Sequence, residues 1–152
     1  AGPRAARLFD ERLAPLCSPK LAGAKALRKP ADLHGQFLIH FNDLEGYAPW
    51  LSWDTWFAGA GVEPLEGKGA LYFSHYDQAM RAALAGQGVA LGRLPVVDDL
   101  LKDGRLVAPF GRRFQVALED KAYWLMAAER QRERREVKLF CAWLLENGRA
   151  SA

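Results

Sequence analysis

Residues 70–93 read ALYFSHYDQAMRAALAGQGVALGR, and this stretch decides the fold class. The short apolar run 70–73 predicts a strand. Residues 76–85 carry their apolar side chains on one face, as an amphipathic helix does. Gly86 suits the left-handed position that follows a helix, and 88–93 predicts the next strand. A strand, a helix and a strand in this order favour an α/β fold with largely parallel pairing.

The same alternation continues on both sides of this stretch. Pro19 and Pro49 each suit the first turn of a helix, Ser18 suits the cap before Pro19, and Pro30 opens a short turn. Further strands are predicted at 9–17, 36–41, 105–110 and 122–128, and further helices at 94–101 and 132–146. Trp50, Trp53 and Trp56 share one side of the helix after Pro49. We interpret them as core packing, with an exposed aromatic platform as the alternative.

Composition and charge exclude several classes of protein. The chain has 152 residues, of which 50% are hydrophobic and 26% charged. Since no apolar run approaches 20 residues and no signal peptide is visible, we expect no membrane partner and a cytoplasmic location. Lys and Arg number 21 against 18 Asp and Glu. The charged stretch 129–138 mixes both signs, so it predicts a solvated helix start and not a surface that binds DNA.

Reactive side chains are present without the spacing that catalysis or metal binding requires. His34, His40 and His75 lack the partners of a metal site. Cys17 precedes a helix with no base nearby, so we interpret it as a small buried side chain. The glycines of 86–92 come before a strand and not before a helix, which is the wrong order for a dinucleotide cofactor. We therefore expect no enzyme activity, no catalytic residue, no metal and no cofactor.

The stretch FSHYDQ, residues 73–78, is the best candidate for a binding site. A predicted strand ends there and a predicted helix begins, so Ser74 and His75 lie beside the first N–H groups of that helix. This arrangement suits a small anion or a carboxylate. The alternative is that Ser74 is an ordinary helix cap.

Four blocks together resemble a known family. They are RLFDERLAPLCSPKLA (7–22), ADLHGQFLIHF (31–41), the run from FSHYDQ to RLVAPF (73–110), and AYWLMAAERQRERREVKLFCAWLLE (122–146). In this order they resemble the effector-binding domain of LysR-type transcriptional regulators, in particular the glycine-cleavage-activator-like branch. The resemblance covers 7–146 and implies a small-molecule effector, a homo-oligomer and promoter DNA as the partner of the full-length protein.

The family resemblance also implies the architecture. It predicts a periplasmic-binding-protein-like fold of type 2, in which two α/β subdomains are joined by two crossing strands. Residues 1–16 would be a first-subdomain remnant and crossover, 17–91 the complete effector-binding subdomain II, and 92–152 the return and the C-terminal part of subdomain I. GVALGR (88–93) would be the second crossing. The family's winged helix-turn-helix and the opening half of subdomain I are absent from this sequence, so we expect a C-terminal fragment whose DNA contacts lie in the absent domain.

The same resemblance implies the effector-binding residues. The loop FSHYDQ and the end of strand 36–41 would face the effector from subdomain II, and the strand at 122–128 from subdomain I. The expected residues are Ser74, His75, Tyr76, His40, Phe41, Asn42 and Tyr123. A carboxylate effector suits neutral donors beside a helix N-terminus. The alternative function is a solute-binding protein of a transport system, which has a similar fold, and whose mature chain would have lost its export signal.

Overall fold

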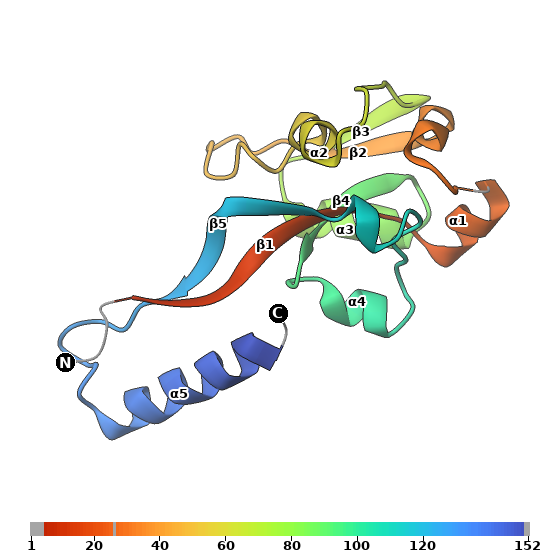
Figure 1. Cartoon of the computed structure of the whole chain (residues 1–152). Helices are drawn as coiled ribbons and strands as arrows, with labels where there is room; N and C mark the ends of the chain where they lie inside the picture. Colours follow the sequence, from red (N-terminus) through yellow and green to blue (C-terminus); the bar gives the residue numbers. More distant parts are fainter. Residues whose placement is uncertain (1–4, 26, 151–152) are drawn as a thin grey trace. The chain divides into compact units, whose positions relative to one another are not determined.

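The computed structural model of the chain describes residues 5–25 and 27–150, with five strands along the described chain (Figure 1). In chain order the elements are β1 (Ala6–Leu16), α1 (Pro19–Lys25), η1 (Pro30–Gly35), β2 (Phe37–Phe41), α2 (Trp53–Ala60), β3 (Gly69–Phe73), α3 (Tyr76–Leu84), β4 (Val89–Leu94), α4 (Asp98–Lys102), η2 (Arg112–Phe114), β5 (Val116–Leu125) and α5 (Arg135–Ala150). The expected alternation of strands and helices is therefore present.

The chain divides into two compact units. The larger unit is Arg12–Val116, and the smaller one combines the residues up to Glu11 with those from Ala117 onward. The backbone thus passes between the units twice, once within β1 and once at the start of β5. The sequence analysis expected boundaries at 17 and 91, whereas these units change at 12 and 117.

A mixed sheet with the strand order β3-β2-β4-β1-β5 runs through the fold. Strand β2 pairs in parallel with both β3 and β4, which agrees with the expected parallel pairing. Strand β4 pairs antiparallel with β1, with Ala14 opposite Gly92. A Cβ atom at Gly92 would overlap the Leu16 side chain, so the close approach of these two strands requires glycine there.

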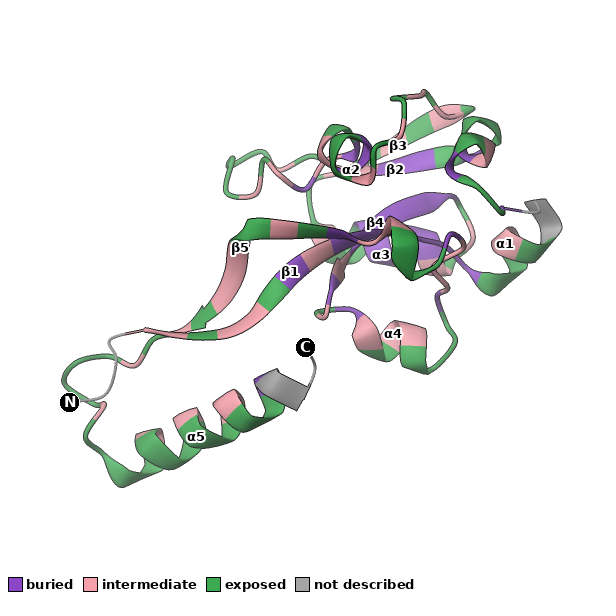
Figure 2. Ribbon diagram, in the orientation of Figure 1, coloured by how far each residue is buried: buried purple, intermediate pink, exposed green. Residues whose placement is uncertain are grey.

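The core of the larger unit forms between this sheet and α3. Ile39 of β2, Ala83 of α3 and Ala90 of β4 are almost completely buried in one cluster, which also takes in Leu106 from the segment after α4 (Figure 2). Small alanines on α3 let the helix lie close to the strands. As expected, Gly86 ends this region in the left-handed conformation, with φ of 74°.

Helix α2 contributes an aromatic cluster to the same unit. Trp56 has no exposed surface, its ring contacts those of Trp53, Phe57 and Phe110, and its indole N–H donates to the Phe114 carbonyl at 2.9 Å. The interpretation of Trp53 and Trp56 as core residues is confirmed.

The expected start of this helix at Pro49 is wrong. The Ser52 side chain caps α2 by accepting the Thr55 N–H at 3.2 Å, and the helix begins at Trp53. The preceding residues form a turn, because Asp43 accepts the N–H groups of Glu45 and Ala48 instead. The cap expected at Ser18 is confirmed by its bond with the Leu21 N–H at 3.2 Å.

The segment after β4 also differs from expectation. Leu94 is still paired with Arg12 in the sheet, so α4 begins only at Asp98. Residues 105–110 form no strand, because only Val107 bridges to the main chain, at Cys17. These residues return to the larger unit, so GVALGR is a central strand of that unit and not the second crossing. The second passage lies at Val116–Ala117.

The smaller unit consists of the first half of β1, most of β5, and α5. Phe9 and Tyr123 contact each other with ring centroids 4.7 Å apart, and Arg7 pairs with Asp10 at 2.6 Å. The expected strand at 122–128 ends at Leu125, and the expected helix start at Arg132 moves to Arg135, because residues 128–134 form turns. Figure 2 shows α5 with few buried residues. Within the described residues, we find no helix with the length and apolar character that crossing a bilayer demands.

Candidate functional site

The carboxyl ends of β2 and β3 bring six of the seven predicted site residues to one edge of the sheet. The two strands are parallel, with His40 opposite Tyr72 and Phe41 opposite Phe73. The Asn42 N–H donates to the Phe73 carbonyl at 2.7 Å, which holds the two strand ends together. The residues His40, Phe41 and Asn42 therefore leave one strand beside the point where Ser74, His75 and Tyr76 leave the other.

The start of α3 is open to solvent at this edge. His75, with extended backbone, occupies the N-cap position and its side chain makes no capping bond. The Ser74 hydroxyl lies 3.1 Å from His75 Nδ1, and both residues are exposed. The alternative that Ser74 caps this helix is therefore wrong. The first turn of α3 presents its positive dipole end next to the Ser74 and His75 side chains.

The Tyr76 hydroxyl bonds the main chain of β4. The hydroxyl accepts the Arg93 N–H at 2.8 Å and donates to the Leu91 carbonyl at 3.5 Å. The Phe41 ring meets the Tyr76 ring edge-on at 6.1 Å, and the Arg93 guanidinium lies 5.7 Å from the centre of the same ring. Phe41 and Arg93 thus contact the ring of Tyr76, and β4 holds its hydroxyl.

A small hollow lies behind these strand ends, inside the larger unit. It encloses about 50 Å³, and its lining includes His40, Phe41, Tyr76, Ser52 and Trp53. This space suits about one or two water molecules, so a metabolite would have to bind at the exposed edge. Sequence analysis missed Ser52 and Trp53 as lining residues, because a capping serine and a core tryptophan leave no separate signal.

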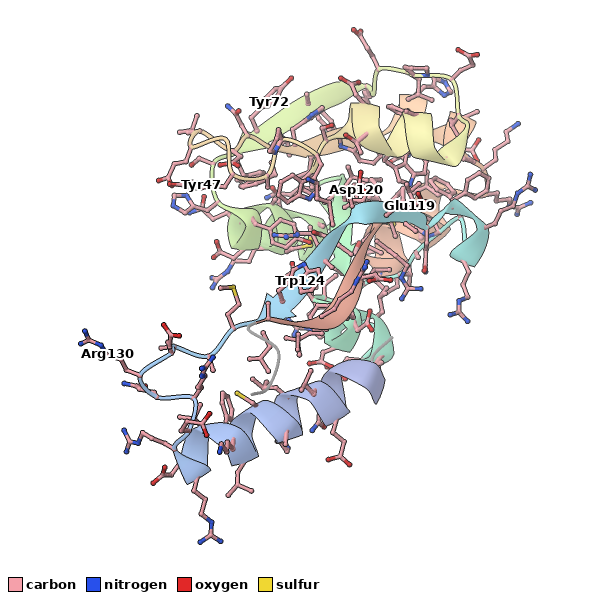
Figure 3. The ribbon with its side chains drawn as sticks, turned by 60° about the vertical axis from the view of Figure 1, so that its left-hand side comes forward. Tyr47, Tyr72, Glu119, Asp120, Trp124 and Arg130 are labelled. Carbon is pink, nitrogen blue, oxygen red and sulfur yellow. The ribbon has the colours of Figure 1, made fainter. Side chains whose placement is uncertain are left out.

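His40 differs from the other candidates in its environment. Its ring stacks on Tyr72 with centroids 4.8 Å apart, and Figure 3 shows Tyr72 on the outside of β3. Burial lowers the pKa of His40 below its ordinary value of 6.5, and nearby Asp54 opposes this shift in part. The lowered pKa favours a neutral imidazole at neutral pH.

Tyr123 belongs to the smaller unit, where it lies on β5 against Phe9. That unit also contains a wider hollow of about 480 Å³, which sequence analysis did not predict. Most of its lining is apolar and comes from the end of β5, the residues just after it and α5, among them Leu125, Met126 and Cys141. Arg132 and Lys138 line it as well, and both pair with Glu133.

The described residues offer neither a metal centre nor a reactive thiol at the candidate site. They contain no group of three His, Cys, Asp or Glu side chains placed to hold a metal ion. His34 bonds the Ala31 carbonyl at 2.8 Å. Cys17 is completely buried, and burial raises the pKa of its thiol to about 11. The interpretation of Cys17 as a small core side chain is confirmed.

Comparison with known proteins identifies the family of this chain. The LysR substrate binding domain matches residues 2–149. The chain belongs to the LysR substrate binding domain family. The resemblance expected from the sequence is therefore confirmed.

Curated LysR-type relatives are transcriptional regulators. The chain is 32% identical over 150 residues to the glycine cleavage system transcriptional activator of Escherichia coli strain K12, which covers 98% of this chain and 46% of the relative. It is 30% identical over 146 residues to the HTH-type transcriptional activator AmpR of Enterobacter cloacae, covering 95% and 46%. The chain thus spans about half the length of these relatives.

Solved LysR effector domains share the fold. The effector domain of the transcriptional regulator AmpR of Pseudomonas aeruginosa matches with a TM-score of 0.71 and 29% identity, covering 96% of this chain and 65% of that one. The AmpR effector binding domain from Citrobacter freundii gives 0.68 and 27%, covering 96% and 68%. The fold is therefore periplasmic-binding-protein-like of type 2, as the sequence predicted. The alternative of a transport protein receives no support from these relatives.

Proposed function

We propose that this LysR-family chain is the effector-sensing part of a transcriptional regulator that works as a homo-oligomer in the cytoplasm. Family membership and the regulator relatives support this proposal. Promoter contacts would come from a DNA-binding domain outside this chain, since the described structure offers no helix-turn-helix and the charged stretch 129–138 mixes both signs. No catalytic step is assigned to any residue.

The two units correspond, in this proposal, to the two family subdomains. Arg12–Val116 would be effector-binding subdomain II, and the smaller unit would be the C-terminal part of subdomain I. The boundaries of subdomain II, expected at 17 and 91, are thereby moved to Arg12 and Val116, the ends of the larger compact unit. Each passage between the units is then one of the two crossing strands of the family.

The effector would be a carboxylate held at the start of α3. The single observation that carries this is the absence of a side-chain cap at His75, next to the exposed Ser74 hydroxyl. A carboxylate would accept the first-turn N–H groups together with these two side chains. Asn42, Phe41, His40 and the ring of Tyr76 would line the same edge.

Calorimetric titration with glycine tests this proposal. Glycine is the first choice because one relative is named for the glycine cleavage system. Glycinamide is the matched control, because it keeps the amine and lacks the carboxylate. We expect binding of glycine, or of another small carboxylate such as alanine or acetate, that is weakened by Ser74→Ala and absent for the corresponding amide. Equal binding of acid and amide would contradict the proposed carboxylate site.

A gel-shift experiment tests the assignment of DNA binding. Residues 1–152 alone should show no sequence-specific binding, whereas a regulator that joins this chain to a winged helix-turn-helix should bind its promoter. Specific, salt-resistant binding by the chain alone would contradict the assignment.

A further inference from the structure

Strands β2 and β4 separate just where the candidate site begins. They pair at Leu38 with Val89 and at Ile39 with Ala90, and both strands continue beyond these residues. The Leu91 carbonyl and the Arg93 N–H follow on β4. Being two residues apart on one strand, these two groups point to the same edge.

The Tyr76 hydroxyl takes the place of the neighbouring strand at this edge of β4. It accepts from Arg93 and donates to Leu91, so one side-chain oxygen satisfies two main-chain groups past the point where the β2–β4 pairing stops. The ring that carries this oxygen is fixed between Phe41 and the Arg93 guanidinium. Contacts with two residues and two hydrogen bonds therefore hold the Tyr76 side chain in place.

On its other edge, the same part of β4 is bonded to β1. Gly92, between Leu91 and Arg93, lies opposite Ala14, and Leu94 lies opposite Arg12. The main-chain groups of Gly92 and Leu94 face β1, because those of Arg93 face the opposite edge. Arg12 is the first residue of the larger unit, and the chain leaves that unit at Glu11. A short chain of contacts thus leads from the start of α3 through the Tyr76 hydroxyl and β4 to the crossing strand.

We propose that the Tyr76 hydroxyl is a positioning group that couples the Ser74–His75 loop to the crossing strand β1. Tyr76 is the first residue of α3 and follows the loop directly, so a shift of the loop displaces its ring. Because the hydroxyl bonds the backbone of β4 at Leu91 and Arg93, that displacement reaches Gly92 between them and its β1 partner Ala14. The coupling to a ligand rests on the proposed function, whereas the link from Tyr76 to β1 does not.

Amide hydrogen exchange of the 152-residue chain without ligand tests this link. Tyr76→Phe removes the hydroxyl and keeps the ring. Tyr47→Phe is the matched control, because Tyr47 is 75% exposed on the loop after β2 (Figure 3). In Tyr76→Phe we expect the amides of Arg93 and Ala14 to exchange about fivefold faster, while Leu38 and Val89 keep the rate of the control.

Two results of this measurement would overturn the proposal. One is that Arg93 and Ala14 exchange at the same rate in both variants. The other is that all four amides become faster by the same factor in Tyr76→Phe, since a uniform change reports a general loss of stability. Restored slow exchange in a variant that keeps a hydroxyl, such as Tyr76→3-fluorotyrosine, would support the role of the hydroxyl itself.

Adding glycine separates coupling from binding. In the wild-type chain, glycine should slow exchange at Ala14 and Arg93. In Tyr76→Phe, at a glycine concentration that saturates the variant, both amides should keep their ligand-free rates. Weaker binding with full protection would contradict the proposal and make the hydroxyl a ligand. If glycine fails to bind the wild-type chain, it is the proposed function for glycine that fails, and the ligand-free comparison still decides the role of Tyr76.

Discussion

Trp56 joins α2 to the segment that leads into β5, and its replacement tests the aromatic core of the larger unit. The side chain has no exposed surface, and its indole N–H is bonded to the Phe114 carbonyl. Trp56→Phe keeps a ring but leaves that carbonyl without its donor, which costs about 1–3 kcal/mol. Trp56→Ala also removes the packing against Trp53, Phe57 and Phe110, so its cost should be about 3–5 kcal/mol.

Urea denaturation of the chain and its variants measures these losses. Trp143→Phe is the matched control, because Trp143 is 55% exposed on α5, and its effect should stay within about 0.5 kcal/mol. A double-mutant cycle of Trp56 with Phe110, whose rings lie 6.5 Å apart, should give a coupling energy of about 0.5–1.5 kcal/mol.

The reasoning would be refuted by a loss below about 1 kcal/mol for Trp56→Ala, which is too small for a buried indole. A coupling energy of zero with Phe110 would be equally damaging. It would mean that the Phe110 ring does not pack on Trp56 of α2.

Three further outcomes follow from charge, burial and exposure. Because burial lowers the pKa of His40, the unfolded chain takes up a proton more readily than the folded one, and the free energy of unfolding should fall as the pH drops below about 6.5. Urea titrations at pH 7.5 and 5.5 measure this dependence, and His40→Asn should flatten it. A thiol reagent should label the partly exposed Cys141 in the folded chain and Cys17 only after unfolding, since burial raises the Cys17 pKa to about 11; rapid labelling of both thiols would contradict the burial. The smaller unit exposes Trp124, Phe140 and Trp143, and β5 is the edge strand of the sheet, so we expect the chain to self-associate. Sedimentation over a concentration series measures this, and a monomer at every concentration would contradict the prediction.

The strand–helix–strand core was predictable from sequence because each element has its own periodicity and its own stop. Apolar runs at 36–41 and 70–73 and the helical stripe of 76–85 fall within a residue of the observed elements. The helix start predicted at Pro49 was wrong because proline is as common in turns as in the first turn of a helix. Only the side-chain bond of Ser52 shows where α2 begins.

The passages between units were harder to predict than the elements. A buried strand such as β4 has the same sequence pattern whether it lies in the middle of a unit or leads out of it, because both environments favour small apolar residues. The segment 105–110 looked like a strand, yet it packs by side chains such as Leu106 and makes one main-chain bridge. For β4 and for 105–110 alike, the outcome depends on which segments pair through their main chains, and these segments lie far apart in the sequence.

The candidate site was predictable in place but not in detail. Parallel pairing brings strand ends to one edge, so residues after 41 and after 73 were expected together. The bond between the Tyr76 hydroxyl and β4 depends on the separation of β2 from β4 after Ala90, which no local sequence pattern predicts. The missing cap at His75 depends in the same way on where α3 begins.

Glycine-dependent transcription by a full-length regulator that carries this chain tests the central claim most directly. The comparison is between wild type, Ser74→Ala and His75→Ala, with Tyr47→Phe as the control at a residue outside the site. Loss of one hydrogen bond to the carboxylate should raise the half-maximal glycine concentration about two- to tenfold for Ser74→Ala, with an unchanged maximal response. If Ser74→Ala and His75→Ala both respond with the wild-type dose dependence, the start of α3 is not the effector site.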